Sequence, residues 1–146
     1  MIHNLNTHPI EEHLLTIKNT GLREAFVHLR QKTLALSPNI HEKIRKMYVA
    51  YEYGRNFAEV VPQTKALKVF LDIEMKHLRD PKGICCDQSR VGRPAWGKIM
   101  FKLLSAEDVP YASDLIKQSY ENRAISTLME LTGNSNFIIH VMRCHQ

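Results

Sequence analysis

The stretch that decides the fold of this 146-residue sequence is Leu67-Lys68-Val69-Phe70-Leu71-Asp72-Ile73-Glu74. Its odd-numbered positions are all aliphatic, and three of its four even-numbered positions are charged. Because successive side chains of a strand point to opposite faces, this alternation predicts a strand with one apolar and one polar face. The apolar face must pack on a core, whereas the polar face can stay partly open and carry a binding site.

Extended segments precede and follow this strand. Residues 48–53 and 57–61 flank Gly54-Arg55-Asn56, an arrangement typical of a hairpin. Residues 98–104 return to the alternation of a strand, and the apolar segment 137–144 is also strand-like. We therefore expect an antiparallel sheet of about four to five strands.

Helical periodicity is found towards the two ends of the chain. Apolar residues recur every three to four positions in residues 10–18 and 22–36, which predicts two amphipathic helices. Ser37-Pro38 resembles a helix start, and it predicts a short third helix with Ile40, Ile44 and Met47 facing inward.

A C-terminal helix completes the pattern. Pro110 is tolerated only in a first helical turn and Gly133 is a typical stop, so we expect the helix to run between them. Helices followed by strands and a last helix are the α+β order, in contrast to the regular alternation that builds a parallel sheet. The sequence therefore predicts a single α+β domain over residues 1–146, with N-terminal helices, an antiparallel sheet and a C-terminal helix packed on it.

Composition indicates the class of protein. Hydrophobic residues make up 44% of the chain and charged residues 24%, as in a globular domain that buries its own core. No apolar run approaches the ~20 residues of a membrane-spanning helix, and residues 1–8 do not resemble a secretion signal. Cys85 and Cys86 are adjacent, and three cysteines make a poor disulfide framework. We therefore expect a soluble cytoplasmic protein with no membrane partner.

The net charge of +5 is concentrated in one part of the chain. Residues 81–105 contain five Lys/Arg and one Asp/Glu, whereas residues 106–146 contain three and five. Such a local excess of cations attracts anions, nucleic acid included. The alternative is that the basic residues only keep the protein dissolved.

This basic stretch overlaps a long irregular loop, residues 79–97, and long loops in compact domains often carry function. Arg90 and Arg93 could grip a phosphate, and Trp96 could stack on a base. We predict that Trp96 packs against the strand at 98–104 or the hairpin and holds both arginines at the rim of a concavity. The alternative is a connecting loop with solvated arginines.

The hairpin adds a further basic and aromatic group. Tyr51, Tyr53 and Phe57 surround Arg55, a mixture found in sheets that read nucleic acid, although aromatics also simply pack well in strands. The candidate ligand-binding residues are Arg55, Lys65, Arg90, Arg93, Trp96 and Lys98.

No catalytic set is evident in the sequence. The acidic residues on predicted strands are Glu52, Glu59, Asp72 and Glu74. Clustered carboxylates hold Mg²⁺ in nucleases, and these four acids are the residues that could do so here. We expect these acids to be surface charges on alternate strand positions, and we assign no catalytic residue.

The histidines and cysteines do not form a recognisable site either. His140 and Cys144, with His145 alongside, lack further ligands at zinc-site spacing. Neither Cys85 nor Cys86 lies in a nucleophile signature. We therefore predict no bound metal and no cofactor.

Four segments together resemble a known family. They are Phe57-Ala58-Glu59-Val60-Val61-Pro62-Gln63, Leu67-Lys68-Val69-Phe70-Leu71, the loop from Asp80-Pro81-x-Gly83 to Asp87-x-Ser89-x-Val91-Gly92, and Leu115-Ile116-Lys117-Gln118-Ser119-Tyr120. They resemble a bacterial domain of unknown function, found alone or as the C-terminal domain of proteins labelled "predicted transport protein", some with a restriction-endonuclease-like N-terminal domain. The resemblance covers about residues 20–122 and leaves 123–146 as a divergent tail. It implies work near nucleic acid, as an accessory to a nuclease or to defence, and supplies no catalytic residues.

Three functions stay open at this point. The first is a non-catalytic binding module for nucleic acid or a nucleotide-like anion. The second is a protein-interaction or homo-oligomerising module, suggested by the apolar segment 137–144 and by Met100 and Leu104 on the outer face of the strand at 98–104. The third is an enzyme of unknown class.

Overall fold

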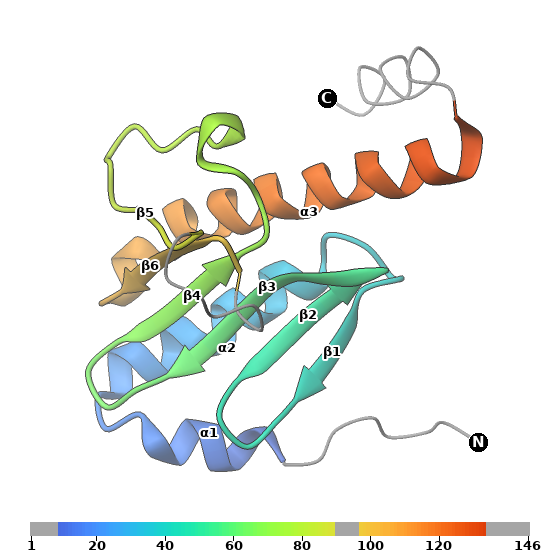
Figure 1. Ribbon diagram of the computed structural model, residues 1–146. Helices are drawn as coiled ribbons and strands as arrows, with labels where there is room; N and C mark the ends of the chain where they lie inside the picture. The colour runs from blue at the N-terminus through green and yellow to red at the C-terminus, as the bar shows by residue number, and fades with distance from the viewer. Residues whose placement is uncertain (1–8, 90–96, 134–146) are drawn as a thin grey trace, which may run out of the picture.

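The computed structural model of the chain describes residues 9–89 and 97–133. Helices cover one face of a six-stranded sheet (Figure 1). The elements are, in order, α1 (Ile10–Thr16), α2 (Thr20–Leu34), β1 (His41–Ile44), β2 (Val49–Tyr53), β3 (Arg55–Pro62), β4 (Leu67–Leu71), the 3₁₀ turn η1 (Met75–His77), β5 (Cys86–Asp87), β6 (Ile99–Leu103), the 3₁₀ turn η2 (Ala106–Asp108) and α3 (Val109–Thr132). This order confirms the predicted α+β class.

The strands follow the order β1-β2-β3-β4-β6-β5, and every neighbouring pair is antiparallel. The strand predicted from the alternation at residues 67–74 is β4, which ends at Leu71 and lies between β3 and β6. Val69 of β4 is opposite Val60 of β3 and Phe101 of β6, so three apolar side chains lie side by side. The sheet has six strands, and not four to five, because β1 and the two-residue β5 extend its edges.

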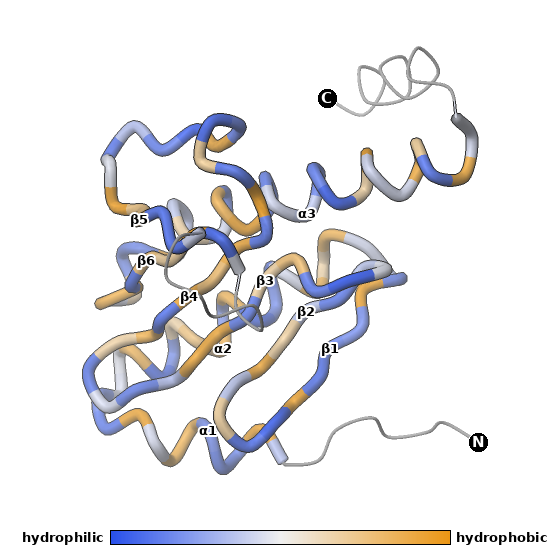
Figure 2. The backbone as a smooth tube through the Cα atoms, in the orientation of Figure 1, coloured by the Kyte–Doolittle hydropathy of each residue, from blue (hydrophilic) through white to orange (hydrophobic). Residues whose placement is uncertain are grey.

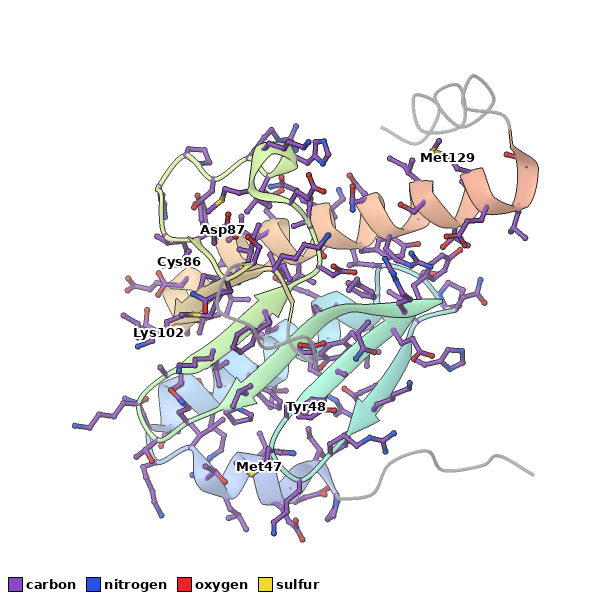
Figure 3. All side chains as sticks on the ribbon, in the orientation of Figure 1. Met47, Tyr48, Cys86, Asp87, Lys102 and Met129 are labelled. Carbon is purple, nitrogen blue, oxygen red and sulfur yellow. The ribbon has the colours of Figure 1, made fainter. Side chains whose placement is uncertain are left out.

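The two longer helices, α2 and α3, lie behind the strands in Figure 1, and no helix within the described ranges lies on the front face. The covered face holds the apolar side chains predicted for β4 and β6, which are all at most 3% exposed. Helix α2 adds Leu22, Phe26 and Leu29 to this core, as its periodicity predicted. The opposite face is mixed, since it carries Lys68 and Lys102 in register and also Phe70 opposite Met100 (Lys102 is labelled in Figure 3).

A β-bulge in β3 helps to position α3. The register of β2 and β3 shifts between Tyr51 and Glu52, which leaves Phe57 as an extra residue on β3. The Phe57 carbonyl accepts a hydrogen bond from Ser119 Oγ at 2.6 Å and another from the backbone N–H of Asp72 at 3.2 Å. Because Ser119 is fully buried on α3, its bond ties the helix to the sheet.

The bond from Ser119 gives a matched pair of predictions on one helix. Ser119→Ala is expected to lower the free energy of unfolding by about 1–2 kcal/mol, because a buried hydrogen bond to a carbonyl is lost. Ser113 Oγ is also buried but has no partner within the described part of the chain, so Ser113→Ala should be neutral or stabilising. Urea denaturation of both variants checks this, and equal losses for the two would contradict it.

The predicted third helix is wrong, because residues 41–44 form the edge strand β1. Ile40 and Ile44 are buried as expected, but a spacing of four residues puts two side chains on the same face of a strand as well as of a helix. Met47, expected to face inward, is 65% exposed beyond the end of β1 (Figure 3). Figure 2 shows β1 as mostly hydrophilic, which suits the edge of a sheet.

A charged pair holds this edge strand to α2. Arg30 on α2 donates from Nε and Nη2 to the two carboxylate oxygens of Glu42 on β1, at 2.7 and 2.8 Å. The Tyr51 hydroxyl of β2 donates to Glu42 as well, at 3.1 Å. Burial and the Glu42 charge raise the pKa of Tyr51 well above its ordinary value, so this tyrosine stays neutral.

The C-terminal helix agrees with its prediction. Pro110 lies in the first turn of α3, and the helix ends at Gly133, whose φ of 63° is left-handed. The apolar stripe of α3 is buried from Val109 to Ser119 and half-buried at Tyr120. The strand expected at 137–144 lies outside the described residues.

Candidate anion-binding site

Three cations from distant parts of the sequence line one cavity of about 250 Å³. Arg55 begins β3, Lys98 directly precedes β6, and Arg123 lies on α3. Because β3 and β6 both run antiparallel to β4, their first residues meet at the end where β4 finishes. Asp72 and Glu74, which follow β4, line the same cavity.

Arg123 is the cation that is most enclosed by the protein. It is only 8% exposed, and its Nε donates a hydrogen bond of 3.1 Å to the carbonyl oxygen of Tyr53. Glycine at position 54 leaves room for this side chain, since an added Cβ would lie only 3.1 Å from Nη2 of Arg123. Gly54 also has a φ of 75°, so this hairpin turn favours glycine for two separate reasons.

Arg123 has no carboxylate partner within the described ranges, since none lies within the 4.0 Å of an ion pair. All 15 Asp and Glu side chains of the sequence belong to those ranges. A buried charge is normally paired, because removing it from water is costly. The guanidinium of Arg123 therefore has the surroundings of a group that pairs with a bound anion.

The two acids of the cavity are each close to another cation. Asp72 lies 3.6 Å from Nη2 of Arg55, and Glu74 lies 3.3 Å from Nζ of Lys76. The hydrogen bond from Lys76 lowers the pKa of Glu74 from its ordinary value, so this acid is ionised at neutral pH. Among the described cations of the cavity, Lys98 and Arg123 are left without an ion-pair partner.

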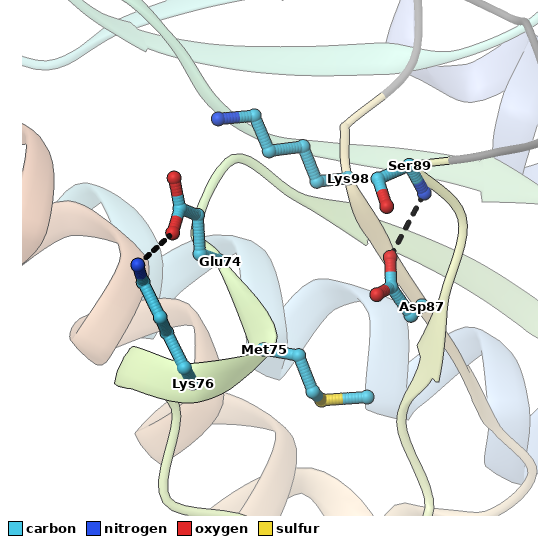
Figure 4. Close-up of a pocket in the computed structure, with 6 residues that line it drawn as sticks. All are labelled: Glu74, Met75, Lys76, Asp87, Ser89 and Lys98. Carbon is cyan, nitrogen blue, oxygen red and sulfur yellow. Dashed lines mark hydrogen bonds and ion pairs between the residues drawn. The ribbon is translucent and has the colours of Figure 1, made fainter.

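A second cavity, of about 450 Å³, adjoins the first and shares Glu74 and Lys98 with it. In Figure 4, Glu74 and Lys98 approach this cavity from different chain segments, one after β4 and one before β6. Met75 supplies an apolar part of its wall, and Asp87 and Ser89 lie on the side of β5. The backbone N–H of Ser89 donates to Asp87 Oδ1 at 2.9 Å, which holds this carboxylate in place.

The structure brings together two of the six residues that the sequence singled out, Arg55 and Lys98. Lys65 is exposed in the turn between β3 and β4, at the opposite end of the sheet, so it does not contribute to this cavity. Arg90, Arg93 and Trp96 lie outside the described residues, as does the predicted packing of Trp96.

Sequence reasoning missed Arg123, although a signal was present. The buried stripe of α3 includes Ile116 and Ser119, and Arg123 continues it at helical spacing. An arginine on the apolar stripe of a helix must have a partner for its charge. The helical spacing was therefore a signal that Arg123 is buried, although it did not show which groups surround the guanidinium.

The aromatic residues of the hairpin belong to the core. Tyr51 and Phe57 are at most 1% exposed, and Tyr53 packs edge-on against Tyr120 with ring centroids 5.4 Å apart. The packing interpretation is therefore confirmed for Tyr51 and Phe57, whose buried rings are not available to stack on bases, whereas Tyr53 is half-buried.

Glu59 departs from the prediction that the strand acids are surface charges. It is only 5% exposed, and its Oε2 has no hydrogen-bond partner within residues 9–89 and 97–133. Burial raises the pKa of Glu59 to about 7, and the charge of Asp72 adds to this, against the lowering effect of the Asn56 side chain and the Gly97 backbone. Glu59 is therefore a buried carboxyl whose raised pKa lies near neutral pH.

Neither a cysteine nucleophile nor a metal site is assembled in the described part of the chain. Burial and the charge of Asp80 raise the pKa of Cys85 to about 12, which makes it a poor nucleophile at neutral pH. No three His, Cys, Asp or Glu side chains of residues 9–89 and 97–133 are placed to hold a metal ion. His140, Cys144 and His145 lie outside these ranges.

No helix in the described part of the chain is both long and apolar enough to cross a bilayer. No solved structure matches the chain significantly. An uncharacterized protein of Haemophilus influenzae is 30% identical over 108 residues, which are 74% of this chain and 36% of that protein. The chain thus spans about a third of the length of this relative. Residues 10–123 match the family described as "Domain of unknown function (DUF5655)", and the chain therefore belongs to this family.

Proposed function

We propose that this domain is a non-catalytic binding module for nucleic acid or a nucleotide-like anion, and that it holds the anion with Arg55, Lys98 and Arg123. The observation that carries the proposal is the buried guanidinium of Arg123, which lines an open cavity with no carboxylate of the described chain within 4.0 Å. A phosphate placed there would supply the missing negative charge. Guanidinium groups bind phosphate oxygens through paired, charge-assisted hydrogen bonds.

The arrangement of the three cations supports a binding role. Arg55 begins β3, Lys98 directly precedes β6 and Arg123 lies on α3, so packing of these elements on the core brings the backbones of the three cations together before any ligand arrives. Preorganised cations do not have to be gathered at the moment of binding, which lowers the entropic cost. A non-catalytic role is favoured because the titratable pairs that line the two cavities, Asp72 with Arg55 and Glu74 with Lys76, are ion pairs with at least one solvent-exposed member.

Removal of the two accessible cations tests this function. The double variant Arg55→Gln/Lys98→Gln should bind fluorescein-labelled single-stranded DNA and RNA at least about tenfold more weakly at low salt, because two phosphate contacts are lost. Its affinity should also fall less steeply with salt than that of the wild type. Lys65→Gln is the matched control, since it removes the same kind of charge at the other end of the sheet.

Fluorescence anisotropy at low and physiological salt measures all three proteins. Equal weakening by Lys65→Gln and by the double variant would show that binding reflects net charge and not this cavity. The proposed function fails if the wild type binds neither DNA nor RNA at protein concentrations of about 50 μM, since non-specific binding alone is commonly stronger than that.

A further inference from the structure

We infer that the cavity selects a terminal phosphate, a phosphomonoester on a nucleotide or at the end of a nucleic acid, over the phosphodiesters inside a chain. This inference rests on the proposed function and narrows it to one class of ligand. It is carried by the charges left unpaired in the cavity, by the burial of Arg123 and by the adjoining second cavity.

The charges of the residues that line the cavity favour a terminal phosphate. Asp72 and Glu74 each lie within 4.0 Å of a cation, Arg55 and Lys76, so Lys98 and Arg123 are the described lining cations without an ion-pair partner. A phosphomonoester carries a charge of about −1.5 to −2 at neutral pH, whereas a phosphodiester carries about −1. A terminal phosphate therefore brings more negative charge to Lys98 and Arg123 than an internal phosphate does.

The different solvent exposure of the three cations also favours a terminal phosphate. The side chain of Arg55 is 69% exposed and Lys98 is exposed, whereas Arg123 is 8% exposed and bound through Nε to Tyr53. A phosphate that reaches Arg123 enters a cavity that the two exposed cations also line. A terminal phosphate has one ester bond and three free oxygens, so it can enter end-on and face cations on three sides. An internal phosphate has ester bonds on two sides, so it has only two free oxygens and the cavity must also accommodate both continuations of the chain.

The adjoining cavity of about 450 Å³ would hold the group that is attached to the phosphate. Its volume lies within the range of pockets that hold small molecules, roughly 300–1,000 Å³. Lys98 lines both cavities, so the phosphate and the attached group would meet at this residue. Met75 gives an apolar surface for a sugar or base, and the carboxylate of Asp87 lies beside it (Figure 4).

The test compares two forms of one oligonucleotide, a 3′-fluorescein-labelled DNA of about ten nucleotides with either a 5′-phosphate or a 5′-hydroxyl. The wild type should bind the 5′-phosphorylated form about tenfold more tightly, because the extra charge meets an otherwise unpaired buried cation. AMP and adenosine serve as competitors. Displacement by AMP but not by adenosine supports a free nucleotide as a source of the phosphate, and preference for the phosphorylated oligonucleotide without displacement by AMP supports a nucleic-acid end.

Variants separate this inference from a general effect of charge. Lys98→Gln should reduce the preference for the 5′-phosphate to about twofold or less, because one of two unpaired cations is removed. Lys65→Gln should keep the full preference. Equal affinity of the wild type for the two oligonucleotides overturns the inference while the proposed function stands. Absence of binding to both forms overturns the proposed function itself.

Discussion

Replacement of Gly97 by alanine is expected to destabilise the domain by about 3 kcal/mol or more, because the new methyl group would overlap the backbone of a neighbouring strand. A Cβ at Gly97 would lie 2.4 Å from the carbonyl oxygen of Leu71 and 2.6 Å from its carbonyl carbon. Leu71 is the residue where β4 pairs with Ile99 at the start of β6. A backbone cannot rotate aside as a side chain does, so the two strands would have to separate at the end that carries the cavity.

Chemical denaturation measures this effect, with Gly83→Ala as the control. Gly83 has a φ of 63°, and a Cβ added there would have no atom within 4 Å, so its replacement carries only the conformational cost of about 1 kcal/mol. If Gly97→Ala unfolds at the same denaturant concentration as the wild type, the close approach of residue 97 to β4 is wrong. In that case the placement of Lys98 beside the cavity is also in question.

Glu59→Gln is expected to stabilise the domain at high pH and not at low pH. An unfolded glutamate titrates near 4.5, whereas Glu59 titrates with a pKa of about 7 in the folded chain, a difference that corresponds to about 3 kcal/mol. Below pH 4.5 the carboxyl is protonated in both states, so it has no effect on stability. Between pH 4.5 and 7 the unfolded chain loses the proton first, and the wild type therefore becomes less stable as the pH rises. Above pH 7 the full penalty remains.

The difference in unfolding free energy between Glu59→Gln and the wild type should therefore grow by about 2–3 kcal/mol from about pH 4.5 to about pH 8. Glu107→Gln provides the control, since this glutamate is exposed on η2. Urea denaturation at several pH values gives both curves. A constant difference across this pH range would show that Glu59 has an ordinary pKa, and hence that it is not a buried carboxyl.

The strands β4 and β6 could be predicted because each buries one face only, so the alternation of polar and apolar residues is visible in the sequence. The strand β1 could not be predicted in this way. Ile40 and Ile44 share a face in a helix and in a strand alike, and the pairing of Lys43 opposite Ala50 of β2 depends on tertiary structure. The strand β5 could not be predicted either, since two residues are too few to show an alternation of polar and apolar side chains.

The candidate site was predicted only in part for a related reason. Arg55 and Lys98 were chosen for their local surroundings, and they do line one cavity, but so was Lys65, which lies at the far end of the sheet. Strand order and register decide which cations lie close together, and a local sequence motif does not predict either of them. Arg123 lies within the helical stripe, where sequence patterns are usually interpreted as packing alone.

The most direct test of the anion site is a nuclear magnetic resonance titration that follows the side-chain Nε–H of Arg123. The hydrogen bond from this group to the Tyr53 carbonyl slows its exchange with water, which makes it observable. On addition of the 5′-phosphorylated oligonucleotide, the Arg123 Nε–H and the backbone amide of Lys98 should shift together and saturate, while the amide of Lys65 should stay unchanged. Binding of the oligonucleotide with an unshifted Arg123 resonance would contradict the proposed site, because the buried guanidinium would then not be the group that receives the anion.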